Sequence, residues 1–310
     1  MTAKVFIDGA AGTTGIEIHE RLAGRRDITL IAIADDRRKD PAARAEALNA
    51  ADAVILCLPD DAAREAVSLI ANDRTRVIDA STAHRTDPRW TYGFAEVAPG
   101  RRDELARATR VSNPGCYPTG FLALVAPLVR AGIVPPALPL SVNATSGYSG
   151  GGKAMIAEFE APGADDAATG FRIYALALGH KHVPEMQAHA GLAHPPLFMP
   201  AVARSYRGML VEVPLHLSLL NGTAGDIRAA LADAYAGSRI VRLAGADPTL
   251  LTLEQCAGTD RLDLFVFANE ALGQVRLVAA LDNLGKGAGG AAVQNLNLVM
   301  GLEETEGLRL

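Results

Sequence analysis

The sequence contains only three cysteines, one tryptophan and no long run of apolar residues. An odd and sparse set of cysteines argues against a disulfide framework and for a reducing cytosol. The apolar runs all fall well short of the roughly 20 residues of a membrane span, so we expect no membrane partner. Lys4 is the only basic residue before the apolar residues that begin at Val5. No apolar core of a signal peptide follows. We therefore expect a cytoplasmic protein.

Positive charge is not in excess either. The formal net charge is -5 and the sequence pI is about 5.8. This balance excludes the basic surface of a nucleic-acid binder, so we expect no nucleic-acid partner. What is present is a 310-residue chain with 49% hydrophobic residues and 30 glycines. That length is sufficient for a large core and two domains, and the glycines indicate many tight turns.

Short apolar runs alternate with helical patterns in the first third of the chain. Continuous apolar segments at residues 5–7, 29–34, 53–58 and 76–79 predict buried strands. Amphipathic stretches between them predict helices, one of them capped by Asp60. This alternation is typical of βαβ units and of a Rossmann-type parallel sheet.

The pattern changes after about residue 116. A long apolar helix is predicted at residues 121–129, and later segments alternate with period two or read as strands, at residues 211–217, 263–267 and 274–281. We therefore predict an α/β chain whose second, α+β domain has a mixed or antiparallel sheet. The expected domains are residues 1–115, completed by a C-terminal helix within residues 285–310, and residues 116–284.

A glycine-rich turn follows the first predicted strand. Gly9, Gly12 and Gly15 surround Thr13 and Thr14 at the point where a helix begins. Glycine permits a tight turn and a close approach to a pyrophosphate, and the helix N-terminus offers N–H groups. The spacing is GxxGxxG rather than GxGxxG and is weak alone. Its place between a strand and a helix favours a dinucleotide site over a glycine turn in another kind of α/β protein.

Two signals after the second predicted strand indicate different dinucleotides. Asp35 lies twenty residues after Gly15, where an acid usually binds the ribose 2′-hydroxyl of NAD. Arg37, Arg38 and Lys39 follow at once, and such a cluster can hold the 2′-phosphate of NADP. Solvated loop charges are the alternative. We expect NADP(H), with Arg37 and Arg38 at the phosphate.

The most distinctive turn carries Cys116. Residues 112–120 include two prolines and two glycines and precede the apolar helix, so Cys116 stands at a helix N-terminus. That position favours the reactive thiolate, and the N–H groups there could form an oxyanion hole. Cys57 lies inside an apolar strand and Cys256 has uninformative neighbours, which fits small buried residues. The sequence therefore predicts Cys116 as the nucleophile.

The heptapeptide Asn-Pro-Gly-Cys-Tyr-Pro-Thr at residues 113–119 resembles the active-site signature of the N-acetyl-γ-glutamyl-phosphate reductases of arginine biosynthesis. The shorter branch of that family is also similar at residues 79–86, 147–153, 179–185 and 282–288. The resemblance implies a fold like those of aspartate-semialdehyde and glyceraldehyde-3-phosphate dehydrogenases. It also implies NADPH-dependent conversion of an acyl phosphate to an aldehyde through a Cys116 thioester. Longer family members carry a Ser-Arg-type pair after the second strand. This chain instead has Asp-Asp-Arg-Arg at residues 35–38, which is a departure from the family pattern at the expected 2′-phosphate contacts.

The same resemblance implies further contacts. A family segment near the nicotinamide matches Asn283 and Gly285. The residues expected to bind substrate are Asn113, Ser81, Gly147, Arg85 and Lys153, the last two as cations for phosphate or carboxylate. Surface charge is the alternative for both cations.

Four of the six residues at 180–185 have polar or ionisable side chains, and three interpretations of them are possible. His180 and His182, with His189 or His194, could bind a metal, could be ordinary surface histidines, or could include a general acid/base. No known metal-ligand spacing appears, and we expect no metal. The resemblance implies the acid/base role, and His182 matches the family motif better than His180. Glu185 is expected to orient the histidine or sense the substrate nitrogen, unless it only compensates a helix terminus.

Rival functions stay open. The same chemistry could act on aspartyl phosphate or on an aminoadipyl phosphate of lysine synthesis. A nucleotide-sensing regulator without catalysis would bind NADP but turn nothing over, and the presence of Cys116, His182 and Glu185 together argues against it. A metal-dependent hydrolase is a third alternative. By analogy of fold, we expect a homodimer or homotetramer.

Overall fold

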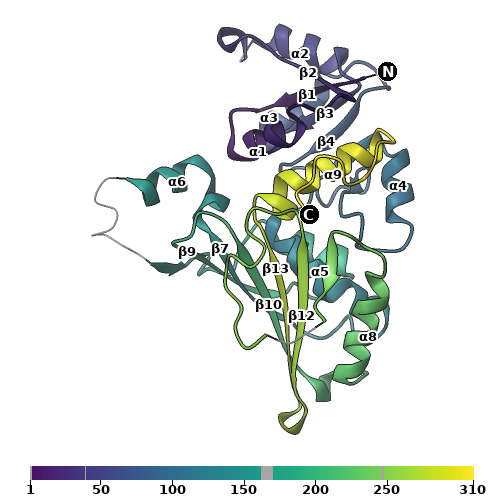
Figure 1. Ribbon diagram of the computed structural model, residues 1–310, viewed down its shortest axis with the longest axis vertical. Coiled ribbons are helices and arrows are strands. Elements are labelled where there is room, and N and C mark those ends of the chain that lie inside the picture. Colours follow the sequence, from purple (N-terminus) through teal and green to yellow (C-terminus); the bar gives the residue numbers. More distant parts are fainter. Residues whose placement is uncertain (1, 39, 162–169, 246–247) are drawn as a thin grey trace. The chain divides into compact units, whose positions relative to one another are not determined.

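The four apolar runs of the first third of the chain form β1 to β4 of a parallel sheet, labelled in Figure 1 of the computed structural model, and two further strands, β5 and β6, complete it. The structure describes all residues except 1, 39, 162–169 and 246–247. The chain divides into two compact units. Unit 1 comprises Met1–Ala95, Gly100–Pro114 and Ala288–Leu308, and unit 2 comprises Glu96–Pro99, Gly115–Gly287 and Arg309–Leu310.

Unit 1 is a doubly wound α/β unit with strand order β2-β1-β3-β4-β6-β5. All of its described strand pairs are parallel. Its elements are β1 (Ala3–Asp8), α1 (Thr13–Leu22), β2 (Ile28–Ile31), η1 (Asp35–Arg37), α2 (Pro41–Ala50), β3 (Ala53–Leu56), α3 (Asp60–Ser68), β4 (Arg76–Asp79), β5 (Thr91–Tyr92), α4 (Arg101–Arg107), β6 (Arg110–Ser112) and α9 (Gly290–Val299).

Alternating side chains of these strands enter two different cores. Val5 and Ile7 of β1 pack in one core with residues of α1, α4 and α9. Phe6, between them, packs in the other core with residues of α2 and α3. Because both faces are covered, the strands read as continuous apolar runs rather than as alternating ones. Val293 and Leu296 of α9 belong to the first of these cores, although they lie near the end of the sequence.

Unit 2 is built on a seven-stranded mixed sheet of order β11-β12-β13-β10-β7-β9-β8. The β11–β12 and β7–β9 pairs are parallel and the other pairs are antiparallel. Its elements are α5 (Cys116–Arg130), β7 (Ser141–Gly147), η2 (Tyr148–Gly151), α6 (Gly152–Glu160), β8 (Phe171–Ile173), α7 (Val183–Ala190), β9 (Leu197–Ala203), β10 (Met209–His216), η3 (Leu217–Leu219), α8 (Ala224–Ala234), β11 (Val241–Leu243), β12 (Leu262–Asn269), η4 (Glu270–Leu272) and β13 (Gln274–Leu281). A π-helical turn, η5 (Gly285–Gly289), follows β13. The predicted fold class is thereby confirmed.

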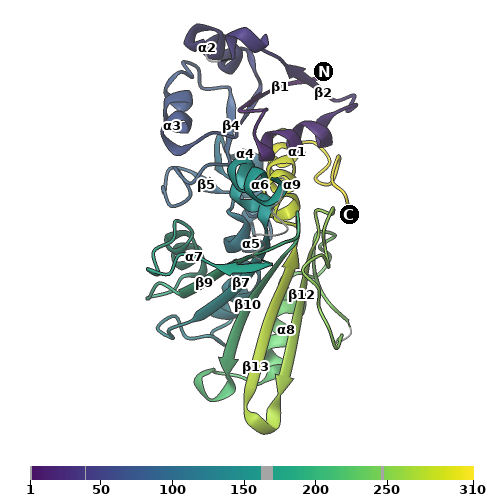
Figure 2. The same ribbon diagram turned by 90° about the vertical axis from the view of Figure 1, so that its left-hand side faces the viewer.

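Helix α5 lies against one face of this sheet and is buried along most of its length. It contacts β10 and β13, and α7 and α8 pack against it; Figure 2 shows α8 behind β12 and β13. Pro127 inside α5 has no N–H for the carbonyl of Ala123 four residues earlier. The Tyr235 hydroxyl, just after α8, donates to that carbonyl at 2.7 Å instead. This bond satisfies a buried acceptor and joins the two helices.

Several predicted boundaries differ from the observed ones. The second strand ends at Ile31 rather than at residue 34, and Asp35 begins the short helix η1. Asp60 was expected to cap a helix, but the N-cap of α3 is Pro59. The Asp60 carboxylate instead accepts hydrogen bonds from the backbone N–H and hydroxyl of Thr82, at 2.9 and 2.5 Å. The prediction that Asp60 caps the helix was wrong, because its carboxylate binds Thr82, which is distant in sequence.

The predicted domain limits stay predictions. The compact units differ from them in placing residues 96–99 and 309–310 with the second unit. Among the described residues, no helix has both the length and the apolar character that a membrane crossing needs.

Candidate active site

The glycine turn of unit 1 is closed by backbone contacts that exclude larger residues. Gly9 has φ +89°, and a Cβ there would lie 2.3 Å from the carbonyl oxygen of Cys57. A Cβ on Gly15 would lie 2.5 Å from the carbonyl oxygen of Gly9. Gly12 closes the turn by donating its N–H to the same Gly9 carbonyl at 2.9 Å, and α1 begins at Thr13. The chain therefore offers a small-residue cradle at a helix N-terminus, which fits a dinucleotide pyrophosphate.

The residues expected at a 2′-phosphate lie in and after η1. Arg37 and Arg38 are both exposed, and Lys39 lies outside the described residues. The Arg37 guanidinium forms an ion pair with Asp40 at 3.2 Å. Hydrogen bonds from the backbone N–H groups of Ala42 and Ala43, followed by the one from Arg37, hold the pKa of Asp40 below its usual value. Arg37 and Arg38 as phosphate ligands stay a prediction.

Cys116 is the first residue of α5, and its position is defined from several sides. The N–H of Gly115, the N-cap, donates to Glu185 Oε1 at 2.8 Å. The Gly115 carbonyl accepts from both the N–H and the hydroxyl of Thr119, each at 2.9 Å. Gly287 packs so closely that a Cβ there would lie 2.9 Å from the Cys116 Cβ. Cys116 itself is partly exposed.

The other two cysteines are in different surroundings. Burial raises the pKa of Cys57 to about 12, and the nearby charges of Asp79 and Asp8 act in the same direction. Burial also raises the pKa of Cys256 to about 12, with Asp263 adding to it. Both side chains therefore stay protonated thiols near neutral pH, as expected for small core residues.

Both histidines of the polar segment lie beside the residue that follows Cys116. The Tyr117 ring centroid is 6.2 Å from that of His180 and 5.9 Å from that of His182, and the two imidazoles are 4.8 Å apart. His182 is buried and N-caps α7, whereas His180 is partly exposed. The backbone N–H of His182 donates to Nδ1 of His180 at 3.2 Å. This bond places the proton of neutral His180 on Nε2.

The pKa of His180 is lowered from its ordinary value of 6.5. Burial of the ring is the larger cause, and the adjacent charge of Lys181 is the smaller one. The neutral imidazole is therefore the form present near pH 7. Glu185, which was expected to orient a histidine or sense a substrate nitrogen, is 1% exposed and holds the Gly115 N–H. Its carboxylate therefore contacts the backbone of the cysteine turn, and its expected role toward a histidine or the substrate stays a prediction.

Tyr174 joins this cluster, although sequence reasoning did not single it out. Its hydroxyl donates to that of Tyr117 at 3.1 Å, which in turn donates to the carbonyl of Ala201. Burial raises the pKa of Tyr174 to about 12, and the charge of the Cys116 thiolate adds to this. Ala175, the next residue, has φ +53°, a left-handed conformation that non-glycine residues rarely adopt. Such strain is common beside active sites and could have been found only from the structure.

Three residues expected to bind substrate lie in unit 1, where their polar groups make internal bonds. Arg85 donates to the carbonyls of Asn113 and Ala80, each at 3.0 Å. The Asn113 side chain donates to the Ala288 carbonyl at 3.1 Å and accepts from Asn295 at 3.0 Å. The Ser81 hydroxyl donates to Asp79. These contacts hold the segment just before the cysteine turn, and the substrate-binding roles stay predictions.

Two other predicted residues, Asn283 and Gly147, bond to Gly208 in unit 2, and Gly285 packs against Thr259. The Asn283 side chain accepts from Gly208 N–H and donates to the Ser149 hydroxyl, both at 2.9 Å. Gly147 donates its N–H to the Gly208 carbonyl at 2.9 Å. A Cβ on Gly285 would lie 2.1 Å from the Thr259 carbonyl oxygen. Lys153 is exposed on α6, apart from these bonds. The roles of all four in binding cofactor or substrate stay predictions.

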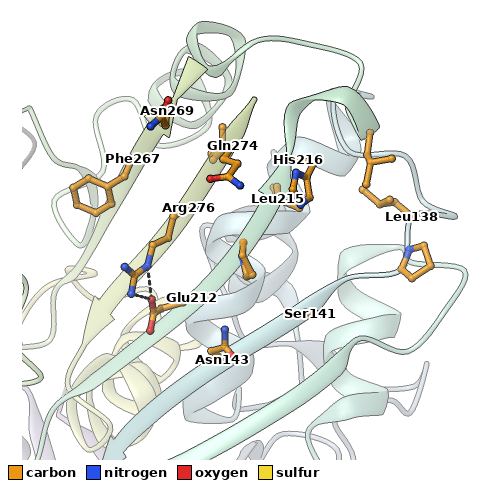
Figure 3. Close-up of a pocket in the computed structure, with 15 residues that line it drawn as sticks. Leu138, Ser141, Asn143, Glu212, Leu215, His216, Phe267, Asn269, Gln274 and Arg276 are labelled. Atoms are coloured by element: carbon orange, nitrogen blue, oxygen red, sulfur yellow. Dashed lines mark hydrogen bonds and ion pairs between the residues drawn. The ribbon is translucent and has the colours of Figure 1, made fainter. Parts of the chain in front are cut away.

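A cavity of about 810 Å³ lies elsewhere in unit 2, on the sheet face opposite α5 (Figure 3). Glu212 and Arg276 form an ion pair in its wall, and Asn143, His216 and Gln274 also line it. The residues described as lining it do not include Cys116, His180 or His182. Within the described part of the chain, no group of three His, Cys, Asp or Glu residues is arranged to hold a metal ion.

The chain matches two family models in succession. The NAD binding domain of semialdehyde dehydrogenases matches residues 4–106, and the dimerisation domain of semialdehyde dehydrogenases matches residues 116–283. Among solved structures, a probable aspartate-semialdehyde dehydrogenase from Pseudomonas aeruginosa superposes with a TM-score of 0.74 at 19% identity, over 97% of this chain and 99% of that one. Aspartate semialdehyde dehydrogenase II from Vibrio cholerae gives 0.70 at 18% identity, over 97% and 98%. These likenesses establish the shared two-domain fold.

Curated relatives are much closer in sequence. The N-acetyl-gamma-glutamyl-phosphate reductase of Trichormus variabilis is 53% identical, over 98% of this chain and 99% of the relative. The enzyme of the same name from Burkholderia ambifaria is 54% identical, over 96% of each chain. Identity at this level over nearly the full length shows the family, and the chain also places a cysteine at the start of a helix whose second residue, Tyr117, contacts two histidines. The chain belongs to the N-acetyl-gamma-glutamyl-phosphate reductases.

Proposed function

We propose that the chain reduces N-acetyl-γ-glutamyl phosphate to N-acetylglutamate γ-semialdehyde with NADPH, in arginine biosynthesis. The observation that carries the proposal is the setting of Cys116 at the start of α5, with Glu185 holding the preceding N–H and Gly287 behind its Cβ. A nucleophile fixed at a helix N-terminus suits attack on an acyl group. The names of the curated relatives supply the substrate.

The proposed reaction has three steps. The Cys116 thiolate attacks the carbonyl carbon, the bond to the phosphate oxygen breaks, and phosphate leaves with the electron pair. Bound NADPH supplies the hydride that reduces the resulting thioester. The tetrahedral oxyanion that hydride transfer leaves then collapses, the electron pair of the carbon–sulfur bond goes to sulfur, and the thiolate and the free aldehyde are released. Splitting the reaction in this way replaces one difficult step by easier ones.

We assign the hydrogen bond that stabilises the reacting oxygen to His180 rather than to His182, the residue that the family motif favoured. His180 is the more exposed ring, and its neutral form carries a proton on Nε2 because Nδ1 accepts from His182 N–H. Nε2–H can donate to the oxygen that gains charge when hydride arrives. His182 is buried at the N-cap position of α7, and its backbone N–H donates to Nδ1 of His180 and so orients that ring.

The histidine assignment has a pH signature. His180→Gln is expected to lower kcat about 100-fold, the usual size of the loss of one oxyanion donor. In the native chain, the acid limb of the kcat profile should lie below pH 6.5, because the pKa of His180 is lowered and protonation of Nδ1 would break the hydrogen bond from His182 N–H that orients the ring. The limb should vanish in His180→Gln and remain in His182→Gln. A lost limb in His182→Gln alone would transfer the role to His182.

The cofactor site is proposed at the glycine turn, with Arg37 and Arg38 at the 2′-phosphate. Both side chains are exposed, and Arg37 lies next to the acid that caps α2. We further propose that the enzyme works in the cytoplasm. Cys57 and Cys256 are thiols rather than disulfide partners, which suits a reducing compartment.

We also propose a homodimer or homotetramer, joined through the sheet face that carries the cavity of Figure 3. Leu197 and Met199 of β9 are exposed, and in register they lie beside Ser141 and Asn143 of that face. The matching family model is described as a dimerisation domain. A second copy would cover apolar side chains that otherwise face water.

The reverse reaction tests the function. Purified protein with N-acetylglutamate γ-semialdehyde, phosphate and NADP is expected to produce NADPH in a phosphate-dependent way, followed by absorbance. NAD and aspartate semialdehyde serve as the parallel comparisons, and both are expected to react more slowly. A preference for aspartate semialdehyde would keep the mechanism and overturn the substrate. NADP binding without turnover of any semialdehyde would support a regulator instead.

A further inference from the structure

The turn that follows β13 is held together by Asp282. Its carboxylate is fully buried and accepts hydrogen bonds from the N–H of Leu284 at 2.8 Å and of Gly258 at 2.6 Å. Its backbone carbonyl accepts the N–H of Gly287, five residues later, at 3.0 Å. This is the hydrogen bond of a π-helical turn, a rare element that often marks functional sites.

One side of this turn touches the nucleophile. Gly287 is close enough that a Cβ would meet both the Cys116 Cβ and the Asp282 carbonyl oxygen, each at 2.9 Å. The main chain at Gly287 is therefore in contact with Cys116. A shift of the turn by a few tenths of an ångström would change the space into which the cysteine side chain fits.

Lys286 anchors the same turn through its side chain. Its ammonium group forms an ion pair with Glu96 at 2.8 Å, and both side chains are only 2% exposed. Glu96 lies in the short segment Glu96–Pro99, which belongs to unit 2 although its sequence neighbours belong to unit 1. Burial raises the pKa of Tyr235, just after α8, and the charge of Glu96 acts in the same direction.

A buried ion pair of this kind is weak evidence for a purely stabilising role. The desolvation cost of two charges often exceeds their attraction, and apolar residues of similar volume are frequently as stable. What the pair does supply is a fixed position, because removal of either partner leaves an uncompensated buried charge. In this chain the fixed element is the turn behind Cys116.

We infer that Lys286 and Glu96 are positioning residues for the reaction. Their ion pair holds the π-helical turn against Cys116 and thereby fixes the nucleophile for attack on the acyl group. The inference rests on the proposed function only for the identity of the substrate. The position and reactivity of Cys116 can be measured without any substrate.

The test compares Lys286→Met with Arg21→Met. Arg21 forms an equally buried ion pair with Glu17 at 2.7 Å, but in α1. For each folded variant, the rate of Cys116 alkylation by iodoacetamide is measured from pH 6 to 9, with Cys116→Ala as the blank. Thermal unfolding and NADPH fluorescence titration verify the fold of each variant. Cys57 and Cys256 should contribute little, since the pKa of each is raised to about 12.

We expect both variants to unfold at a lower temperature. Only Lys286→Met should show a changed alkylation profile and a kcat about 100-fold lower, the scale of effect of a 1 Å misplacement, with KM and NADPH affinity nearly unchanged. Glu96→Gln keeps the shape of the side chain and covers the case in which Lys286→Met fails to fold. It should show the same changes to a smaller extent.

Native alkylation and native kcat in a folded Lys286→Met or Glu96→Gln variant would overturn the inference. The same losses in Arg21→Met would also overturn it, since they would follow from general destabilisation. If the native protein turns over no acyl phosphate, the alkylation profiles still decide whether the pair positions Cys116. Failure of the proposed function is thus distinguishable from failure of the inference.

Discussion

Cys116→Ala is expected to lower kcat/KM for the semialdehyde in the reverse reaction by about 10⁴-fold, the scale of loss when a covalent nucleophile is removed. No other cysteine can take its place: the pKa of Cys57 and that of Cys256 are each raised to about 12 by burial. The measurement is phosphate-dependent NADPH formation in the reverse assay.

The control for this prediction is Cys256→Ala, which removes a buried thiol next to Asp263. It should retain kcat within a few-fold, although it leaves a small cavity in the core. The nucleotide turn is in unit 1, so Cys116→Ala should still bind NADPH with native affinity. Turnover by Cys116→Ala within tenfold of the native rate would contradict the covalent mechanism.

Gly15→Ala is expected to weaken NADPH binding by roughly 100-fold, which corresponds to about 2.7 kcal/mol. The added Cβ would lie 2.5 Å from the Gly9 carbonyl oxygen and 2.7 Å from the Ala10 Cα. Both are backbone atoms, so the turn itself must shift and the N–H groups at the start of α1 must move from the pyrophosphate. Fluorescence titration of NADPH measures the loss.

Gly225→Ala in α8 is the matched control. The nearest atom to its added Cβ would be the Thr223 hydroxyl at 3.5 Å, an ordinary contact, and alanine favours a helix over glycine. NADPH affinity should not change in that variant. In Gly15→Ala, alkylation of Cys116 should stay native, since the cysteine belongs to unit 2. Native NADPH affinity in Gly15→Ala would exclude the glycine turn as the pyrophosphate site.

Local signals in the sequence were sufficient for much of the fold. The apolar runs predicted β4 and β13 with their observed bounds, because buried strands are continuous in hydrophobicity. The same signal overextended the second strand to residue 34. In the structure β2 pairs with β1 only from Ile28 to Ile31, and hydrophobicity alone does not reveal where a neighbour ends.

The candidate site was predictable where the chemistry is local and not where it depends on distant partners. Cys116 and the two histidines stand in dense polar motifs, and the structure gathers them around Tyr117. The Lys286–Glu96 pair joins residues 190 positions apart, and Glu96 has no distinctive sequence neighbourhood. The contact of Gly287 with Cys116 likewise depends on how the turn after β13 folds. No sequence pattern predicts that fold.

The central claim is a covalent acyl group on Cys116, and the most direct measurement is intact-protein mass after mixing with N-acetyl-γ-glutamyl phosphate in the absence of NADPH. The account predicts one N-acetylglutamyl group per chain, located on Cys116 by peptide mapping, and a burst of one phosphate per active site. Cys116→Ala should show neither. Steady turnover with NADPH but no adduct, or an adduct on another residue, would contradict it.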